Sequence, residues 1–600
     1  MSNIFQYVID QEAGFRKPVY LEEGWWWSFK EHVRRSFLLK NSQFTTFNED
    51  RDRRPFKNII RPVLNIQYRT EGFDVKDIEI FVENPESYYK SFLIRKYHVK
   101  WARENNLDTF IDDVVESYVD YGGALVKNVN GVRPEVVDLR SIAFCDQTDI
   151  LSGPFAIKHY LSPDQLRDMT KLGWGTKNAS TTVEDLILKA EHYKYQDKEG
   201  LKSETPGKYI EIYELHGTFS EKYLQGEDLK FSSQIHILGF YKDDKANRIG
   251  VTLFANREPT LPFKFLPRDK IYGRALGWGG VEELFESQIW TNFSEIQIIE
   301  MLEMASKTLF KTTDPRFKTR NSLFNYKQGQ IFDLQEGTDL AQIDTAPKNL
   351  PAFQDREDRW ELHANKLGAA SEIMQGEQPV SGTPFKSVEA QLIEVSSPHF
   401  WRRGKLATFL DEIYRDWIIP HLGKQVVKGV KFLETLSTDE LLEISKQVAE
   451  SRTNRRIAEL LFKGEVVFSE QRDILSQILQ AEFLKGGKTR FLEILKGEMA
   501  GEKLNVLTNI AGKQKNMVLM TDKVVNLVRQ FLATPQLRQD PELVRLLNTI
   551  LESSGMSPIL FSPRPELMGG GQAGPSQPSA GGVSPLRDLS ASGKAPMAKQ

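Results

Sequence analysis

Few residues of this 600-residue chain stand in a spacing that supports catalysis. The sequence has no GxxxxGK[ST] nucleotide loop, no HExxH or HxH pair among its nine histidines, and no GxSxG turn around Ser371 or Ser381. Adjacent carboxylates such as Asp112-Asp113 lie in amphipathic or turn contexts, where a solvated face is more common than an acid/base pair. We therefore predict that the protein is not an enzyme and that it holds no metal and no cofactor.

Four glycines between residues 273 and 280 superficially resemble a phosphate-binding loop. They follow a Pro- and Arg-rich stretch rather than a clear strand, and the helix that they open starts with Glu282 and Glu283, which would repel a phosphate. We do not expect a nucleotide site here.

The charged residues after this loop are separated by sign. Residues 281–310 contain no Pro or Gly, which predicts one continuous helix about 45 Å long at roughly 1.5 Å per residue. Apolar residues occupy nearly its whole circumference, so we expect contacts on several sides. Acids of this helix that fall within about a third of its circumference are Glu282, Glu286, Glu300 and Glu303. The cations that follow it are Lys307, Lys311, Arg316, Lys318, Arg320 and Lys327.

This stretch alone fits two interpretations. One is the core helix of a large α-rich enzyme, whose C-terminal lysines complement the helix dipole. The other is a packed post with a charged tip.

Composition is that of an ordinary protein of two to four domains, with 40% apolar and 27% charged residues. The net charge of -3 gives no global basic field, so affinity for nucleic acid must come from local patches. A single cysteine, Cys145, excludes an intramolecular disulfide and fits a reducing compartment. Because the first residues resemble no signal peptide and no apolar run reaches about 18 residues, we expect no contact with a membrane.

Apolar periodicity predicts an α+β fold, predominantly α. Residues 24–121 are expected to be helical, and Asn130-Gly131 predicts a hairpin turn at the start of a largely antiparallel region that extends to residue 272. A second long helix begins near Phe353, and Pro398 is expected to kink a later one. Residues 424–560 are expected to be nearly all helical, and the Gly-, Pro- and Ser-rich tail after 561 to be disordered. The predicted strands are 142–146, 155–161, 209–219, 234–242 and 249–255.

The order of these parts resembles the portal protein of tailed double-stranded DNA bacteriophages, in particular portals of short-tailed phages. Five motifs carry the resemblance: RRPFKNIIRPVLNIQ, DDVVESYVDYGGALV, PEVVDLRSIAFCDQTD, YGRALGWGGVEELFESQIWTNFSEIQ and SGTPFKSVEAQ. Their order and spacing matter more than any one of them, and they cover most of the chain up to about residue 420.

The resemblance implies a portal-like division of the chain. Its expected parts are a wing (1–272), a first stem helix (273–306), a clip (307–351), a second stem helix (352–375), a tunnel loop (376–387), a long kinked helix returning to the wing (388–430), a helical crown-like region (431–561) and a disordered tail (562–600).

The resemblance also implies a function. Portals are head-to-tail connectors, homo-oligomeric rings, usually of twelve subunits, at one capsid vertex of the virion. Such a ring is a channel for packaging and ejecting double-stranded DNA. Its other expected partners are the terminase large subunit, tail adaptor proteins, and the major capsid and scaffold proteins, with assembly in the host cytoplasm.

Candidate site residues follow from this assignment. The four acids named above would face the channel and repel DNA phosphates, or else form ion pairs between subunits or a solvated outer face. The six cations would contact DNA, the terminase or the adaptor, or else form a plain solvated surface. Lys386, the one cation of the expected tunnel loop, is a candidate contact to the DNA backbone. The alternative functions are another virion structural or scaffold-interacting protein without a DNA channel, and a nucleic-acid-processing enzyme with an unrecognised motif.

Overall fold

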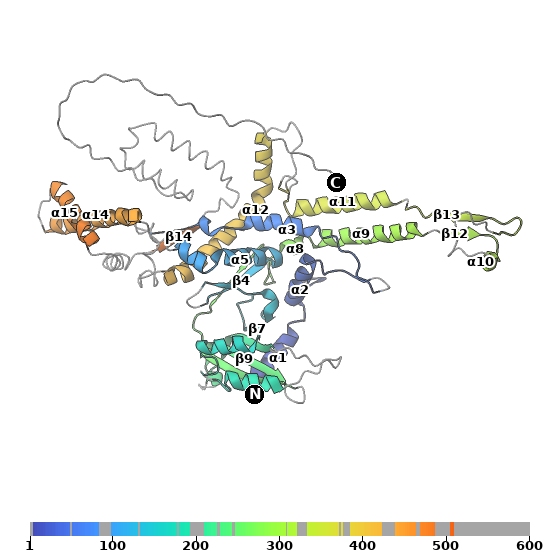
Figure 1. Ribbon diagram of the computed structural model, residues 1–600. Coiled ribbons are helices and arrows are strands. Elements are labelled where there is room, and N and C mark those ends of the chain that lie inside the picture. The colour runs from blue at the N-terminus through green and yellow to red at the C-terminus, as the bar shows by residue number, and fades with distance from the viewer. Residues whose placement is uncertain are drawn as a thin grey trace, which may run out of the picture. The chain divides into compact units, whose positions relative to one another are not determined.

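The computed structural model of the chain describes most residues up to 508 (Figure 1). The described residues are 4–47, 51–82, 98–129, 133–176, 179–192, 209–224, 229–242, 247–307, 309–320, 333–347, 349–370, 374–375, 385–422, 438–463, 469–485 and 504–508. Helices and antiparallel strands both occur among them and helices predominate, so the predicted α+β class is confirmed.

The N-terminal segment is less helical than predicted. Trp25–Trp27 forms a strand, β2, which pairs with β1 (Val19–Glu22) in a hairpin that turns at Gly24, whose φ is +77°. The predicted helix therefore begins at Phe29, because the residues before it form this hairpin. The remaining elements of this segment are α1 (Ile4–Gly14), α2 (Phe29–Lys40), α3 (Ile60–Glu71), β3 (Ile78–Val82) and α5 (Leu107–Tyr121).

The strand-rich region is a five-stranded antiparallel sheet in the order β10-β9-β8-β7-β6, which confirms the predicted strands. Its strands are β6 (Ile142–Phe144), β7 (Phe155–Leu161), β8 (Ile210–Ser220), β9 (Phe231–Lys242) and β10 (Arg248–Arg257). The two short predicted helices are also present, as α6 (Pro163–Met169) and α7 (Val183–His192). The side chain of Ser162 caps α6 in a capping box with Gln165.

A second sheet joins this region to the helices. The predicted hairpin is present as β4 (Gly123–Lys127) and β5 (Glu135–Val136), although its turn residues 130–132 lie outside the described part of the chain. On its other side β4 pairs with β11 (Phe263–Pro267). The glycines 273–280 therefore do follow a strand, contrary to the prediction.

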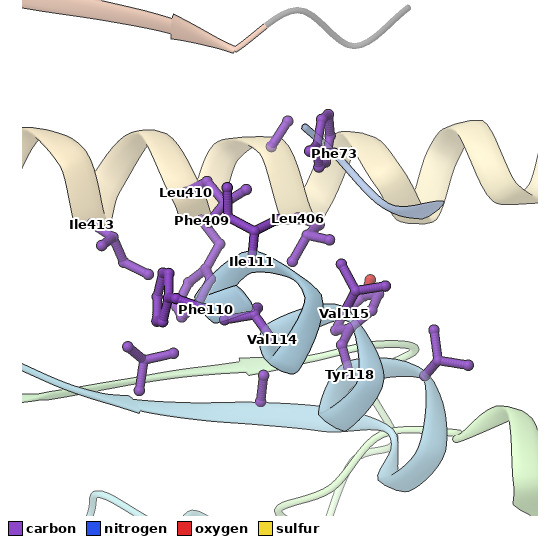
Figure 2. Packing of buried hydrophobic residues seen from close by; sticks show 14 of the residues in the cluster. Phe73, Phe110, Ile111, Val114, Val115, Tyr118, Leu406, Phe409, Leu410 and Ile413 are labelled. Atoms are coloured by element: carbon purple, nitrogen blue, oxygen red, sulfur yellow. The ribbon is translucent and has the colours of Figure 1, made fainter. Parts of the chain in front are cut away.

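The largest hydrophobic core lies between α5 and α12 (Phe385–Ile413) (Figure 2). Leu406, Phe409, Leu410 and Ile413 of α12 recur at the spacing of one helical face, and they point toward Phe110, Ile111, Val114, Val115 and Tyr118 of α5. Pro398 lies inside α12, and the ribbon changes direction along its length in Figure 1. A π-helical segment (Tyr414–Ile418) then continues the helix to residue 422.

The region expected to be nearly all helical contains one strand. Helices α14 (Thr438–Phe462) and α15 (Ser469–Lys485) fit the prediction, but β14 (Leu504–Thr508) pairs antiparallel with β3. This pairing was not predictable from local pattern, because it joins residues more than 400 positions apart. The rest of 486–561, the tail after 561 and most of the expected tunnel loop lie outside the described residues.

Gly122 is the point where α5, β11 and the glycine-rich segment meet. Its carbonyl oxygen accepts hydrogen bonds from the N–H groups of Arg268 and Gly277, each at 2.9 Å. Its φ is +81°, and a Cβ there would lie 2.3 Å from the carbonyl oxygen of Gly277. The glycines at 277 and 279 thus permit a close approach of backbones.

We expect Gly122→Ala to destabilise the protein more than Gly24→Ala. Both positions have a positive φ, which costs alanine roughly 1–2 kcal/mol, but only Gly122 is surrounded by backbone. Overpacking adds about 1–3 kcal/mol at Gly122. Calorimetric unfolding temperatures would measure the difference, and equal shifts in the two variants would contradict the close approach.

Candidate functional site

The segment expected to be one stem helix consists of two helices. A turn at Leu284 separates α8 (Gly280–Glu283) from α9 (Phe285–Ser306). The helix also ends at Ser306 rather than at Phe310, because Lys307 has an extended backbone and the following residues form β12 (Leu309–Thr312).

Helix α9 packs against α11 (Leu350–Leu367), which is shorter than the predicted helix 352–375 (Figure 1). The rings of Trp290 and Trp360 stack at 6.3 Å, with 13° between their planes. Near the other end of α9, the hydroxyl of Thr345 donates to the carbonyl oxygen of Ala305 at 3.3 Å. Residue 290 contacts residue 360, whereas residue 305 contacts residue 345, so residue numbers rise along α9 as they fall along its partner. The two helices are therefore antiparallel, as predicted.

The side of α9 that is buried within the chain is mainly polar. Gln288 accepts a hydrogen bond from the N–H of Ile59 at 2.9 Å and donates to the carbonyl oxygen of Lys57 at 2.6 Å. Asn292 accepts from the N–H of Lys57 at 3.2 Å. Ser287, Thr291 and Ser294 are buried as well. This face binds the backbone of the extended segment before α3.

Large apolar side chains of the same helix are exposed. Trp290 is 37% exposed, Phe293 48%, Leu302 47% and Met304 51%. Burial of such side chains is ordinarily the main favourable term in packing. The sequence predicted contacts on several sides of this helix. The single chain buries its polar residues together with Ile296 and Ile298 and leaves these four apolar side chains exposed.

Two carboxylates, those of Glu295 in α9 and Glu357 in α11, lie close together. Glu357 is buried, and its Oε1 lies 2.6 Å from the Nζ of Lys57. Burial, the charge of Glu357 and a hydrogen bond to Glu357 raise the pKa of Glu295, while Lys57 acts in the opposite direction.

The four predicted acids do not form one set. Glu282 lies on α8 and pairs with Arg274, with oxygen–nitrogen distances of 2.6 and 2.9 Å. Glu300 pairs with Arg54 at 3.1 Å. Glu286 and Glu303 are exposed on α9. Glu282 and Glu300 therefore form ion pairs within the chain, which neither the channel role nor the alternatives considered for these acids included.

The tip beyond the helix pair contains two antiparallel strands, β12 and β13 (Leu340–Ile343). The short helix α10 (Phe317–Arg320) follows β12 along the chain. The buried Asp314 accepts hydrogen bonds from the N–H groups of Arg316 and Gln335, at 2.8 and 3.0 Å. The carboxylate of Asp314 therefore stabilises the turn that follows β12.

The predicted cations of the tip have varied positions. Lys307, Lys311 and Arg316 are exposed, and Lys318 and Arg320 lie in α10. Lys327 lies outside the described residues. Lys386 lies in the first turn of α12 rather than in a loop.

A buried charge network holds the base of the helix pair, and sequence reasoning missed it. Arg268 and Glu71 are both fully buried, and the Nη2 of Arg268 lies 2.7 Å from the Oε1 of Glu71. His399 contacts the same carboxylate at 3.0 Å, and its Nε2 lies 3.3 Å from the carbonyl oxygen of Ala369, just after α11. Arg402 adds contacts to Asp269 at 2.9 Å and to Glu283 of α8 at 3.5 Å.

Electrostatics within the network favour its charged form. Burial alone would raise the pKa of Glu71, but Arg268 and the hydrogen bond from His399 outweigh it, so the pKa lies below its ordinary value. Because the participating residues come from α3, the β11–α8 connection, α8 and α12, no local pattern signals them. The network thus contacts Glu283, the last residue of α8, and the backbone at Ala369, just after α11.

Within the described part of the chain, no group of three or more His, Cys, Asp or Glu side chains is arranged to hold a metal ion. A search of the same residues finds no helix that is long and apolar enough to cross a membrane.

No family model and no curated protein matches this sequence. Among solved structures, a chain from the neck of a native gene transfer agent (GTA) particle, computed with C12 symmetry, is similar at 9% identity and a TM-score of 0.31, over 79% of this chain and 99% of that one. A chain from the virion of the native particle has 10% identity and a TM-score of 0.27, over 78% and 98%. A chain from the neck of the empty particle, computed with C6 symmetry, has 9% and 0.30, over 78% and 98%. At these scores the likeness assigns no family.

We expect Arg268→Met to destabilise the protein by about 3–5 kcal/mol, because it leaves Glu71 charged and buried beside fewer partners. Arg167→Met is the matched control. Arg167 also bridges two acids, Asp164 and Glu184, but all three lie at the surface, where solvent screens such pairs and they contribute little to stability. Calorimetric unfolding of both variants measures the contrast, and similar unfolding temperatures would contradict the role of the network.

Glu295→Gln should change how the stability of the helix pair depends on pH. Since the pKa of Glu295 is raised in the folded chain, the folded state holds this proton more tightly than the unfolded state. The stability that Glu295 contributes is therefore present at low pH and is lost as pH rises from about 4.5 through the folded pKa. Amide exchange protection in α9 should fall with pH more in the wild type than in Glu295→Gln.

Glu303→Gln, which removes an exposed acid from the same helix, is the control for the pH experiment. A wild-type profile that coincides with that of Glu295→Gln would show that the two carboxylates do not interact.

Proposed function

We propose that this protein is a portal subunit, which assembles into a ring at the capsid vertex and forms the channel through which double-stranded DNA is packaged and ejected. The observation that carries the proposal is which side chains α9 buries and which it leaves exposed. This helix buries Gln288, Thr291 and Asn292 within its own chain and leaves Trp290 and Phe293 in contact with water.

An exposed apolar face on a helix whose other sides are occupied supports assembly with further chains. One side of α9 contacts α11, through Trp360 and Glu357, and another contacts Lys57 and Ile59. Ring symmetry supplies a neighbour for the remaining side of every copy.

The two antiparallel helices, with a strand pair between them in sequence, support the proposal of a ring with a DNA channel. They fall where the sequence resemblance expects two stem helices (273–306 and 352–375) and a clip (307–351). In a ring of such pairs, Glu286 or Glu303 on a channel wall would repel DNA phosphates and so reduce friction during translocation. The exposed cations Lys307, Lys311 and Arg316 suit contacts with DNA or with acidic surfaces of the terminase and adaptor.

Images of the purified full-length chain, together with native mass measurement, test this function. We expect closed rings, of twelve subunits in the virion, with a central hole wide enough for a DNA duplex. A monomer or a simple dimer at every protein and salt concentration would contradict the proposal. Closed assemblies without a hole would instead favour a virion structural protein that has no DNA channel.

A further inference from the structure

One stripe along α9 has the spacing of a helix–helix interface. Successive members are separated by four, three, four, three and four residues, which is the heptad pattern that keeps one face toward a partner helix. The members of this α9 stripe are Glu286, Trp290, Phe293, Gln297, Glu300 and Met304, and all are exposed except the half-buried Gln297.

The α9 stripe is largely separate from the faces that the chain already uses, although its member Glu300 pairs with Arg54 at 3.1 Å. The contacts to the extended segment come from Gln288 and Asn292, and the carboxylate contact to α11 comes from Glu295. Trp290 lies at the border, because its ring stacks on Trp360 and yet is 37% exposed. At about 100° per residue the stripe forms a third, separate side of the helix.

The outer face of α11 shows the same spacing. Asp355, Arg359, Leu362 and Lys366 are separated by four, three and four residues, and all are exposed. They lie opposite the buried Glu357 and Ala364, which face the chain's interior. We call these four residues the α11 stripe.

The charges of the two stripes are complementary. No Lys or Arg occurs between Arg274 and Lys307, so α9 itself carries only acids. The α11 stripe offers two cations, and of these Arg359 already pairs with Asp355 at 2.9 Å. Glu286 and Lys366 form no ion pair within the described residues. A second copy of this chain would supply each with an opposite charge.

We propose that the α9 stripe packs against the α11 stripe of the next subunit. This inference rests on the proposed ring, in which the helix pairs stand parallel to the symmetry axis. Rotation about such an axis keeps every residue at its own height. Within one chain Trp290 is level with Trp360, and antiparallel packing therefore makes Glu286 level with residue 364.

This register defines the contacts. At about 1.5 Å per residue, Lys366 of the next subunit lies beside Glu286, Leu362 lies beside Trp290, and Arg359 lies beside Phe293. The interface is head-to-tail, since different faces of one chain meet, and repetition of it closes a ring. It covers the exposed Trp290 and Phe293 and places Glu286 in an ion pair rather than in the channel.

Disulfide trapping tests the register. We expect oxidised Glu286→Cys/Lys366→Cys protein to give a ladder of covalent oligomers under denaturing, non-reducing conditions, up to the full ring. The native Cys145 does not interfere, because it is buried and burial raises the pKa of its thiol, which keeps it unreactive. Met304→Cys/Lys366→Cys is the matched control, since Met304 is on the same stripe but about 27 Å farther along the helix. The control should give no ladder.

A charge reversal tests the pairing independently. Glu286→Lys and Lys366→Glu should each raise the protein concentration needed for half-assembly severalfold, and the double variant should restore it toward the wild-type value. Circular dichroism of each variant confirms that it folds.

The results separate this inference from the proposed function. Rings in images without a ladder from the matched pair, or a disulfide that forms only within single chains, would overturn the interface and leave the portal function standing. A lack of rescue in the double variant would also overturn it. Absence of rings in the wild type would overturn the proposed function itself.

Discussion

The ion pair between Glu71 and Arg268 is the interaction on which the arrangement of this protein depends. Both groups are fully buried, so neither can be left without the other. Around this pair, His399 and Arg402 bring α12 to the same point, and Glu283 brings the start of the helix pair. Segments that lie up to about 330 residues apart are thereby held together by charge as well as by the surrounding hydrophobic core.

The interactions that hold the helix pair in place differ from those of the core. Its α9 helix is fixed to the chain by amide side chains bound to backbone, through Gln288 and Asn292, while Trp290, Phe293, Leu302 and Met304 remain exposed. Hydrogen bonds of this kind specify one geometry but contribute only about 1 kcal/mol each. The single chain therefore sets the position of α9, and in the proposed ring the larger hydrophobic contribution would come from association.

Much of the fold could be predicted from the sequence where local pattern decides the structure. The alternation in β7 to β10 identified the sheet, since each strand presents a distinct face to the core, and the Ser162 cap identified α6. Prediction failed where distant residues decide. The turn at Leu284, the pairing of β14 with β3 and the Glu71–Arg268 network all depend on contacts between remote segments. Among the candidate site residues, the exposure of Glu286 agrees with the sequence, whereas the pairing of Glu282 with Arg274 required the folded chain.

The stack of Trp290 on Trp360 has a geometric consequence for a ring. It sets the rotation of α11 relative to α9, and hence the angle between the two sides that each subunit offers to its neighbours. In a closed circle of n copies this angle must match a turn of 360° divided by n. The curvature of such a ring would then depend on this aromatic contact. A subunit in which the two indole rings were displaced relative to each other would form a wider or narrower ring through the same surfaces.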